Sequence, residues 1–263
     1  MYEFNYHKPG SLADAAKLLG AEDAKLVAGG MTLVPTLKQR LAKPSDLVDL
    51  AGVGSLSGIK EEGGGLTIGA MTRHADVHRS AVVKSVIPAL AALAGMIGDP
   101  AVRNRGTMGG SVANNDPAAD YPSAVVGLGA TVVTTKREIA GDNFFTGMFE
   151  TALGQDEIIT AIKFPKPQAA AYQKFKNPAS RYAIVGVFVA RRADGVRVAV
   201  TGAGPCVFRV PEMESALGKS FSADAIKDIA IPQDGLNSDI HASAEYRAHL
   251  VNVMARRAVA ACG

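Results

Sequence analysis

A Gly-Gly pair between a strand pattern and a helix pattern is the part of this sequence best placed to do chemistry. Gly29-Gly30 follows a short apolar run, residues 25–28, and precedes residues 33–41, whose apolar side chains recur at helical spacing. Glycine permits a positive φ and has no Cβ to hold a ligand away from the backbone. Successive free N–H groups beside the N-terminus of a helix form a concave anion site. The expected ligand is a phosphate.

A second Gly-Gly pair lies in a similar sequence context. Gly109-Gly110 lies in a small-residue stretch, residues 106–122, which contains Pro117 and Pro122 at positions compatible with helix entry. Neither pair has the G-x-G-x-x-G or the G-x-x-x-x-G-K-[ST] spacing of the common nucleotide loops. Either pair alone could therefore be a tight turn without a ligand. Two such segments in one chain favour a single extended ligand that is held from two sides.

Both segments resemble a known family. Residues 28–35 (AGGMTLVP) and 107–111 (TMGGS) are similar to the paired FAD-pyrophosphate loops of the flavin-binding medium subunit of molybdenum hydroxylases. That family includes the carbon monoxide dehydrogenase medium subunit and the flavin domain of xanthine dehydrogenase. Residues 239–247 resemble its C-terminal domain, so the resemblance covers nearly the whole chain. Met31 and Thr32 depart from the polar residues usual in the first loop, which leaves that loop's backbone role intact.

The resemblance implies a set of FAD-binding positions. In the two glycine segments these are Val27, Ala28, Gly29, Gly30, Met31, Thr32, Leu33, Thr107, Met108, Gly109, Gly110 and Ser111. It places Ile97 and Ile159 against the flavin or adenine ring, although each also fits plain core packing. Asp116 and Asp120 follow the second glycine pair, and one of them could accept a hydrogen bond from a ribose hydroxyl; the alternatives are a helix cap and a solvated carboxylate. The resemblance places the ribose role on Asp120. Lys176 and Tyr182 would approach the isoalloxazine, where a cation favours the reduced flavin.

No catalytic residue and no metal site is expected in this chain. There is no G-x-S-x-G elbow and no recognisable pairing of a serine or cysteine with a histidine. Potential ligands at helical spacing are His74 and His78, and His241, Glu245 and His249. Neither set has an evident further ligand, and two cysteines, Cys206 and Cys262, cannot supply the four thiolates of an iron–sulfur cluster. Chemistry would then belong to a bound cofactor.

Composition indicates an ordinary globular protein. The chain has 263 residues, 48% hydrophobic and 20% charged, with a net charge of +3 and scattered Lys and Arg, which argues against nucleic-acid binding. The longest apolar run, residues 86–96, is broken by Pro88 and Gly95 and is too short to span a membrane. The first residues lack the apolar core of a signal peptide. We therefore expect a cytoplasmic protein.

The expected fold class is α+β in two domains. An FAD-binding domain, residues 1–167, would contain a small parallel unit (1–55) and a mixed or antiparallel sheet (56–167). The Pro-rich residues 165–168 would lead to a C-terminal domain, 168–263, with a small antiparallel sheet and helices. Helices are expected at residues 12–19, 33–41, 75–79, 86–97, 211–217, 222–230 and 242–261. Strands are expected at residues 25–28, 47–50, 56–60, 66–70, 130–135, 144–149, 158–164, 172–175, 184–191 and 197–201.

The function that follows from the resemblance is electron transfer. The chain would be the FAD-binding medium subunit of a hetero-oligomer with a molybdopterin-binding large subunit and an iron–sulfur small subunit. It would pass electrons from the iron–sulfur clusters to an external acceptor. Two alternatives remain at this stage: a self-contained FAD oxidoreductase with its own substrate pocket, and a nucleotide-binding scaffold without redox activity.

Overall fold

Three short parallel strands and two helices form the N-terminal part of the computed structural model, which describes residues 1–262. The strands have the order β1-β3-β2 and all pair in parallel. Their bounds, with those of the helices, are β1 (Asn5–His7), β2 (Lys25–Val27), β3 (Asp46–Asp49), α1 (Leu12–Leu19) and α2 (Leu33–Lys38). Helix α1 begins where expected, because the Ser11 hydroxyl accepts a hydrogen bond from the Asp14 N–H.

A five-stranded antiparallel sheet, in the order β4-β5-β10-β6-β7, forms the middle of the molecule. Its strands are β4 (Ile59–Glu62), β5 (Gly65–Gly69), β6 (Thr131–Thr134), β7 (Glu138–Ala140) and β10 (Ile159–Pro165). The helices between them are α3 (His74–Arg79), α4 (Ala81–Val86), α5 (Pro88–Gly95), α6 (Pro100–Arg103), α7 (Met108–Asn114) and α8 (Tyr121–Gly127). A two-stranded hairpin is formed by β8 (Phe145–Gly147) and β9 (Glu150–Thr151).

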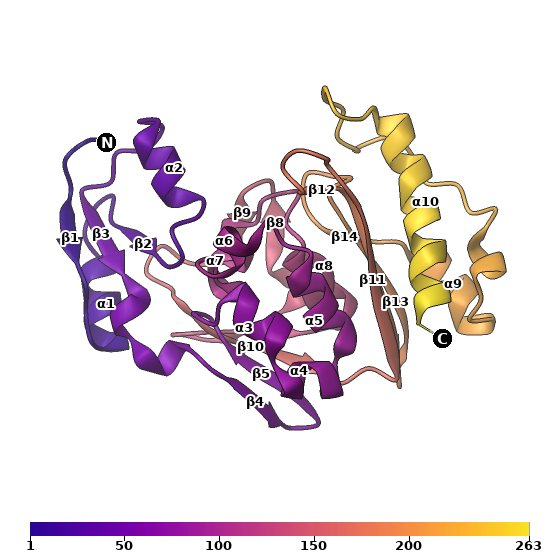
Figure 1. The fold of residues 1–263 in the computed structure, drawn as a ribbon, viewed down its shortest axis with the longest axis horizontal. Helices are drawn as coiled ribbons and strands as arrows, with labels where there is room; N and C mark the ends of the chain where they lie inside the picture. The colour runs from indigo at the N-terminus through magenta and orange to yellow at the C-terminus, as the bar shows by residue number, and fades with distance from the viewer. Residues whose placement is uncertain (263) are drawn as a thin grey trace.

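The C-terminal part is an antiparallel sheet between two layers of helix. Its strands are β11 (Ala169–Lys176), β12 (Ala183–Arg192), β13 (Gly195–Thr201) and β14 (Phe208–Arg209), and its helices are α9 (Pro211–Lys219) and α10 (Ala244–Ala261). In β12, Val187 and Val189 pack in one core with Met254 of α10, whereas Phe188 packs in the other core with Leu90 of α5. Because successive side chains of a strand point to opposite faces, both faces of this sheet are buried. Figure 1 shows the sheet edge-on between α8 and α10.

The α+β class expected from the sequence is confirmed, and most expected elements lie within a few residues of their predicted bounds. The helix expected over residues 86–97 is wrong in part: it divides at Ile87, and Pro88 begins α5. Proline lacks the N–H that would continue α4, but it is well suited to the first turn of a new helix. The helix expected over 222–230 is a single 3₁₀ turn, Ala223–Ile226.

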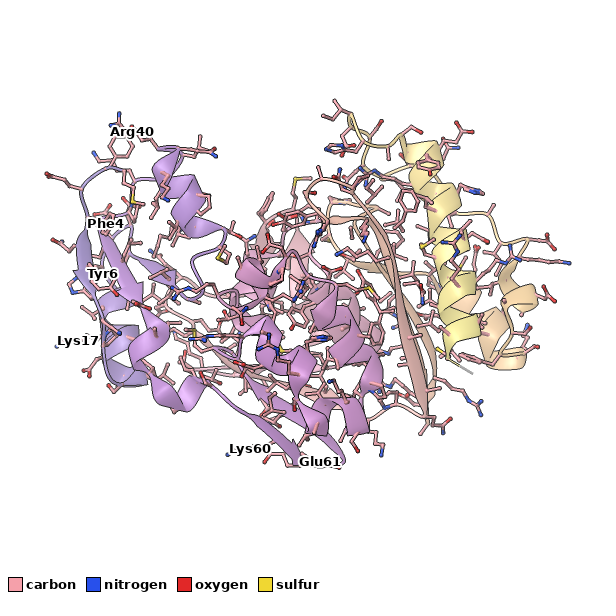
Figure 2. All side chains as sticks on the ribbon, viewed as in Figure 1. Phe4, Tyr6, Lys17, Arg40, Lys60 and Glu61 are labelled. Atoms are coloured by element: carbon pink, nitrogen blue, oxygen red, sulfur yellow. The ribbon has the colours of Figure 1, made fainter. Side chains whose placement is uncertain are left out.

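Charged side chains and some large hydrophobic ones lie on the outside of the molecule. Figure 2 shows Lys17 and Tyr6 on the outer surface of the N-terminal part, and Lys60 and Glu61 at the edge of the middle sheet. Among the helices of residues 1–262, none is long and apolar enough to cross a membrane.

Candidate functional site

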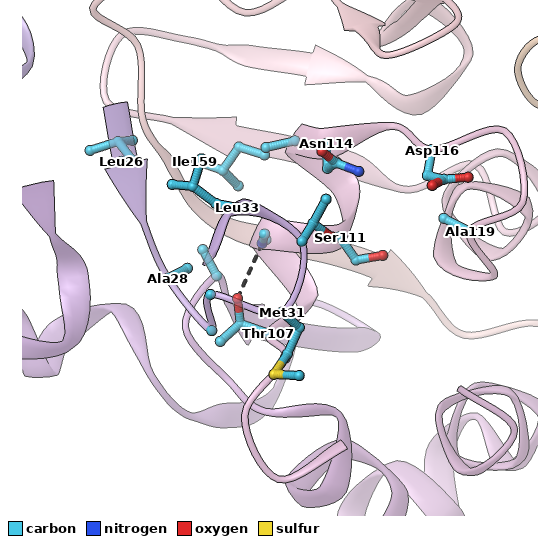
Figure 3. Close-up of a pocket in the computed structure, with 18 of the residues that line it drawn as sticks. Leu26, Ala28, Met31, Leu33, Thr107, Ser111, Asn114, Asp116, Ala119 and Ile159 are labelled. Atoms are coloured by element: carbon cyan, nitrogen blue, oxygen red, sulfur yellow. Dashed lines mark hydrogen bonds between the residues drawn. The ribbon is translucent and has the colours of Figure 1, made fainter. Parts of the chain in front are cut away.

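A cavity of about 800 Å³ lies between the N-terminal part and the middle sheet. The first glycine loop, the start of α7, the segment after α7, the loop from Phe149 to Ile159 and residues 179–182 all contribute to its wall. Figure 3 shows Ala28 and Met31 of the first loop close to Thr107 and Ser111 of the second glycine segment. Two segments that are about 80 residues apart in the chain therefore face one space, as the idea of one extended ligand requires.

Glycine is required at both positions of the first pair, for different reasons. Gly30 has a φ of +71°, in the left-handed region that side chains disfavour. Gly29 contacts the backbone before α7: a Cβ built on it would lie 2.3 Å from the Arg105 carbonyl oxygen and 2.7 Å from the Gly106 Cα. The first glycine loop is thus held directly against the second segment, and no other residue type fits at Gly29 without moving the two apart.

The first glycine loop presents a run of free backbone donors. Within residues 1–262, the N–H groups of Gly29, Gly30, Met31, Thr32 and Leu33 make no hydrogen bond to backbone or side-chain acceptors. The next residue closes the run, because the Val34 N–H donates to the Gly30 carbonyl at 3.1 Å. Consecutive unpaired donors at the start of a helix form an anion site. The expectation of a phosphate-sized cradle at this loop is therefore consistent with the geometry.

The second glycine pair is different from what the sequence predicted. Gly109 and Gly110 are in the first turn of α7 and neither has a positive φ. Gly109 donates to the Ala70 carbonyl at 2.8 Å, and Gly110 donates to the Thr107 Oγ1 at 3.2 Å, the dashed line in Figure 3. The expectation of free N–H groups at this pair is wrong. The Thr107 hydroxyl caps the helix at Gly110, and the Ala70 carbonyl, just after β5, accepts the Gly109 N–H.

Close packing explains the second pair instead. A Cβ on Gly109 would lie 2.5 Å from the Ala70 Cβ, so glycine lets α7 lie directly on the end of β5. What the start of α7 offers to the cavity is the pair of hydroxyl groups of Thr107 and Ser111, both of which line it. A hydroxyl can donate a hydrogen bond to a phosphate oxygen without the help of the backbone.

Asp120 lies at the cavity wall in a buried ion pair. Its carboxylate accepts hydrogen bonds from the Tyr172 hydroxyl and from the Lys174 Nζ, the latter at 2.9 Å. The Lys174 and Asp120 side chains are only 2% and 5% exposed, and Lys174 also donates to the Met96 carbonyl at 3.1 Å. Burial raises the pKa of Asp120, and the Lys174 ammonium opposes that rise. Since a carboxylate has about four acceptor positions, Asp120 keeps capacity for a further donor in the cavity.

His74 contributes a neutral imidazole to the same wall. Burial lowers its pKa to about 4, and the Arg103 charge adds to the effect. Its Nδ1 has no hydrogen-bond partner, nor does the hydroxyl of Tyr121, whose ring centroid is 5.3 Å from that of His74. His78 instead points at α5, where Nδ1 lies 2.9 Å from the Ala91 carbonyl. No group of three or more histidine, cysteine or carboxylate side chains within residues 1–262 is arranged to hold a metal ion.

Glu157 fixes the loop that forms another part of the wall. Its carboxylate accepts hydrogen bonds from the Thr134 hydroxyl at 2.6 Å, the Arg137 guanidinium at 3.1 Å and the Gly154 N–H at 2.9 Å. These donors, with Arg137 the strongest, lower the pKa of Glu157 to about 2. The carboxylate is therefore a structural anchor for residues 153–158, with its oxygen atoms already engaged.

The structure brings most of the predicted site residues to this cavity. Those that line it are Ala28, Gly29, Gly30, Met31, Thr32, Leu33, Ile97, Thr107, Gly109, Gly110, Ser111, Asp120, Ile159 and Tyr182. Three do not line it: Val27 is in β2, Met108 has a fully buried side chain, and Lys176 is exposed at the end of β11.

Sequence reasoning missed several lining residues. They include His74, Asn114, Phe149 and Arg181. Asp116, which the sequence offered beside Asp120, also lines the cavity. Arg181 could have been found as the neighbour of Tyr182. Phe149 had no signal, because an aromatic residue in a short strand pattern reads as core.

Comparison with known protein families identifies this fold and cavity as those of an FAD-binding protein with a C-terminal sheet domain. Residues 2–167 match the family model described as "FAD binding domain in molybdopterin dehydrogenase", and residues 170–262 match "CO dehydrogenase flavoprotein C-terminal domain". The chain belongs to the family of FAD-binding subunits of molybdenum hydroxylases. The family resemblance and the FAD cofactor predicted from the sequence are confirmed.

Relatives match the chain over nearly its whole length. It is 36% identical to the carbon monoxide dehydrogenase medium chain of Hydrogenophaga pseudoflava, with 97% of this chain and 96% of the relative covered. It is 37% identical to the nicotine 6-hydroxylase medium subunit of Paenarthrobacter nicotinovorans, with 98% and 96% covered. Among solved structures, carbon monoxide dehydrogenase from Hydrogenophaga pseudoflava superposes with a TM-score of 0.90 at 36% identity, over 99% of this chain and 97% of that chain. Quinoline 2-oxidoreductase from Pseudomonas putida 86 also gives 0.90, at 28% identity over 99% and 97%.

Proposed function

We propose that this chain is the electron-transfer flavoprotein subunit of a molybdenum hydroxylase complex. In that complex a large subunit with molybdopterin oxidises the substrate, and a small subunit carries electrons through iron–sulfur clusters to this chain. The chain then delivers them to an external acceptor. The proposal is supported by the medium-subunit names of relatives that are matched over almost their full length.

The observation that carries the proposal is the free donor run from Gly29 to Leu33. A diphosphate needs several donors at once, and this loop offers them on backbone atoms that are held in place by Gly29 against Gly106. The residues present therefore fit FAD. We assign the pyrophosphate to this loop, with the Thr107 and Ser111 hydroxyls on its other side.

The remaining assignments follow the wall of the cavity. Asp120 would accept a ribose or ribityl hydroxyl, and Ile97 and Ile159 would pack on the ring systems. Tyr182 would lie beside the isoalloxazine. Bound FAD supplies the redox chemistry, and the protein supplies position, exclusion of water and electrostatic environment. Lys176 is exposed at the end of β11 and does not line the cavity, so its approach to the flavin stays a prediction.

We further propose that the FAD-binding domain comprises residues 1–167 and the C-terminal domain residues 168–263. In this division Lys174 and Tyr172 reach from the C-terminal sheet to Asp120 of the FAD-binding domain. The C-terminal sheet would thus complete the cofactor site. The cytoplasmic location expected from the sequence stays a prediction.

Cofactor release tests the proposal. The native complex is denatured and the released flavin is separated by chromatography; FAD is expected, and FMN or no flavin would overturn the assignment. The subunits that co-purify with the chain are identified by mass spectrometry. A molybdopterin-binding and an iron–sulfur subunit are expected, and hydroxylation of a substrate by this chain alone would contradict the division of labour.

A further inference from the structure

The turn between β8 and β9 carries a residue that the turn itself disfavours. Met148 and Phe149 join the two strands, and Phe149 has a φ of +55°. Glycine or asparagine is the usual choice at such a position of a two-residue turn, since a side chain with a Cβ is strained there. A bulky aromatic residue in the left-handed region is an outlier.

Asn115 holds this turn in its strained form. The side-chain NH₂ of Asn115 donates to the carbonyls of Gly147 and Glu150, both at 2.8 Å. The backbone carbonyl of Asn115 accepts a hydrogen bond from the Phe149 N–H at 3.1 Å. Asn115 is fully buried and itself left-handed, with a φ of 42°. Three hydrogen bonds from one buried residue therefore fix the direction of the turn. Strain that is so heavily supported by its surroundings is typical of ligand-contacting segments.

The Phe149 ring lines the cavity but is poorly covered by protein. It is 57% exposed, which is unusual for a phenyl ring held on a rigid turn. Tyr182, 48% exposed, lines the same cavity. The Phe149 N–H bonds to the carbonyl of Asn115, and the next residue, Asp116, lines the same cavity as the two rings.

We infer that Phe149 is a cofactor-binding residue whose ring packs on a planar ring of FAD. The inference rests on the proposed function. The planar ring systems are the parts of a dinucleotide on which a phenyl ring packs well, and an aromatic partner on a rigid turn loses little freedom on binding. Both the isoalloxazine and the adenine of FAD have the required chemistry, and the experiment below separates them.

A single substitution tests the inference because the stability of the apo protein and its affinity for FAD are expected to change in opposite directions. Phe149→Asn in the full-length, deflavinated chain removes the ring and places a residue that tolerates a positive φ. The melting temperature of the apo protein is expected to rise, while the dissociation constant for FAD rises about tenfold. Phe149→Tyr keeps the ring and should bind FAD as the parent chain does. Met148→Ala, a substitution at the exposed neighbour, is the matched control and should change neither quantity.

Titration with FMN and with ADP identifies the ring. A weaker affinity of Phe149→Asn for FMN alone assigns the isoalloxazine, and a weaker affinity for ADP alone assigns the adenine. Unchanged FAD affinity in Phe149→Asn would overturn the inference, as would a fall in apo melting temperature parallel to the loss of affinity. If the parent chain itself does not bind FAD, the proposed function fails and this inference fails with it.

Discussion

Lys174→Met should destabilise the protein far more than an ordinary lysine substitution. Lys174 lies in β11 and donates to Asp120 at the start of α8, so its removal leaves a carboxylate that is 5% exposed without its counter-charge. Breaking a buried ion pair on one side costs about 3–5 kcal/mol, because the remaining charge is left without compensation. The lower part of that range is expected here, since the Tyr172 hydroxyl still donates to Asp120.

Urea unfolding at pH 7 of the parent, both single variants and Lys174→Met/Asp120→Asn gives the double-mutant cycle. The double variant has no buried charge at this place and should lose only about 1–2 kcal/mol. An interaction energy above about 1.5 kcal/mol is therefore expected. Lys163→Met is the control: Lys163 pairs with Glu138 at the surface, where an ion pair contributes at most about 1 kcal/mol.

The pH dependence gives an independent check on the same pair. In Lys174→Met the folded Asp120 has a raised pKa and no ammonium to oppose it. A carboxyl whose folded pKa is raised is favoured in its protonated form, so the loss of stability should shrink as pH falls from 7 toward 4. Additive single-variant losses, or a loss that does not depend on pH, would refute the buried-pair reasoning.

Three further predictions concern groups around the cavity. The pKa of His74 is about 4, so the free energy of unfolding of the parent should fall by up to about 3 kcal/mol as pH is lowered from 6.5 to 4. In urea unfolding, His74→Gln should lack this pH dependence, whereas the control His249→Gln, at an exposed residue, should keep it. Glu157→Gln should lose about 1–2 kcal/mol at neutral pH, with the difference disappearing as pH falls from about 4.5 toward 2; a constant difference would contradict the anchor role. Gly110→Ala should lower the apo unfolding free energy by about 1 kcal/mol, since the added Cβ would lie 2.9 Å from the Thr107 cap, and an apo stability equal to the parent's would refute this.

The sequence predicted the fold well where local chemistry decides it. Ser11 and Gly20 mark the ends of α1, and the continuous apolar run of β12 is typical of a buried strand. Prediction from the sequence failed where a residue distant in the chain supplies the hydrogen-bond partner. The free donors expected at Gly109-Gly110 are taken by the Ala70 carbonyl and the Thr107 hydroxyl, and only the packing of α7 on β5 brings Ala70 there.

The residues of the candidate site were likewise predictable only where neighbours in the chain determine their position. Residues of the first glycine loop were predictable because strand, glycine pair and helix follow one another directly in the chain. The partner of Asp120 was not, since Lys174 reaches it from a sheet more than 50 residues further along. Phe149 was not predictable either, because its left-handed turn depends on three hydrogen bonds from Asn115.

Amide hydrogen exchange with and without FAD tests the central claim most directly. In the apo chain, the N–H groups from Gly29 to Leu33 should exchange rapidly, while that of Gly109 should already be protected by the Ala70 carbonyl. Addition of FAD should slow exchange at the first glycine loop by an order of magnitude or more and leave Gly109 nearly unchanged. Protection that appears only outside residues 29–33 would contradict the assignment of the pyrophosphate to this loop.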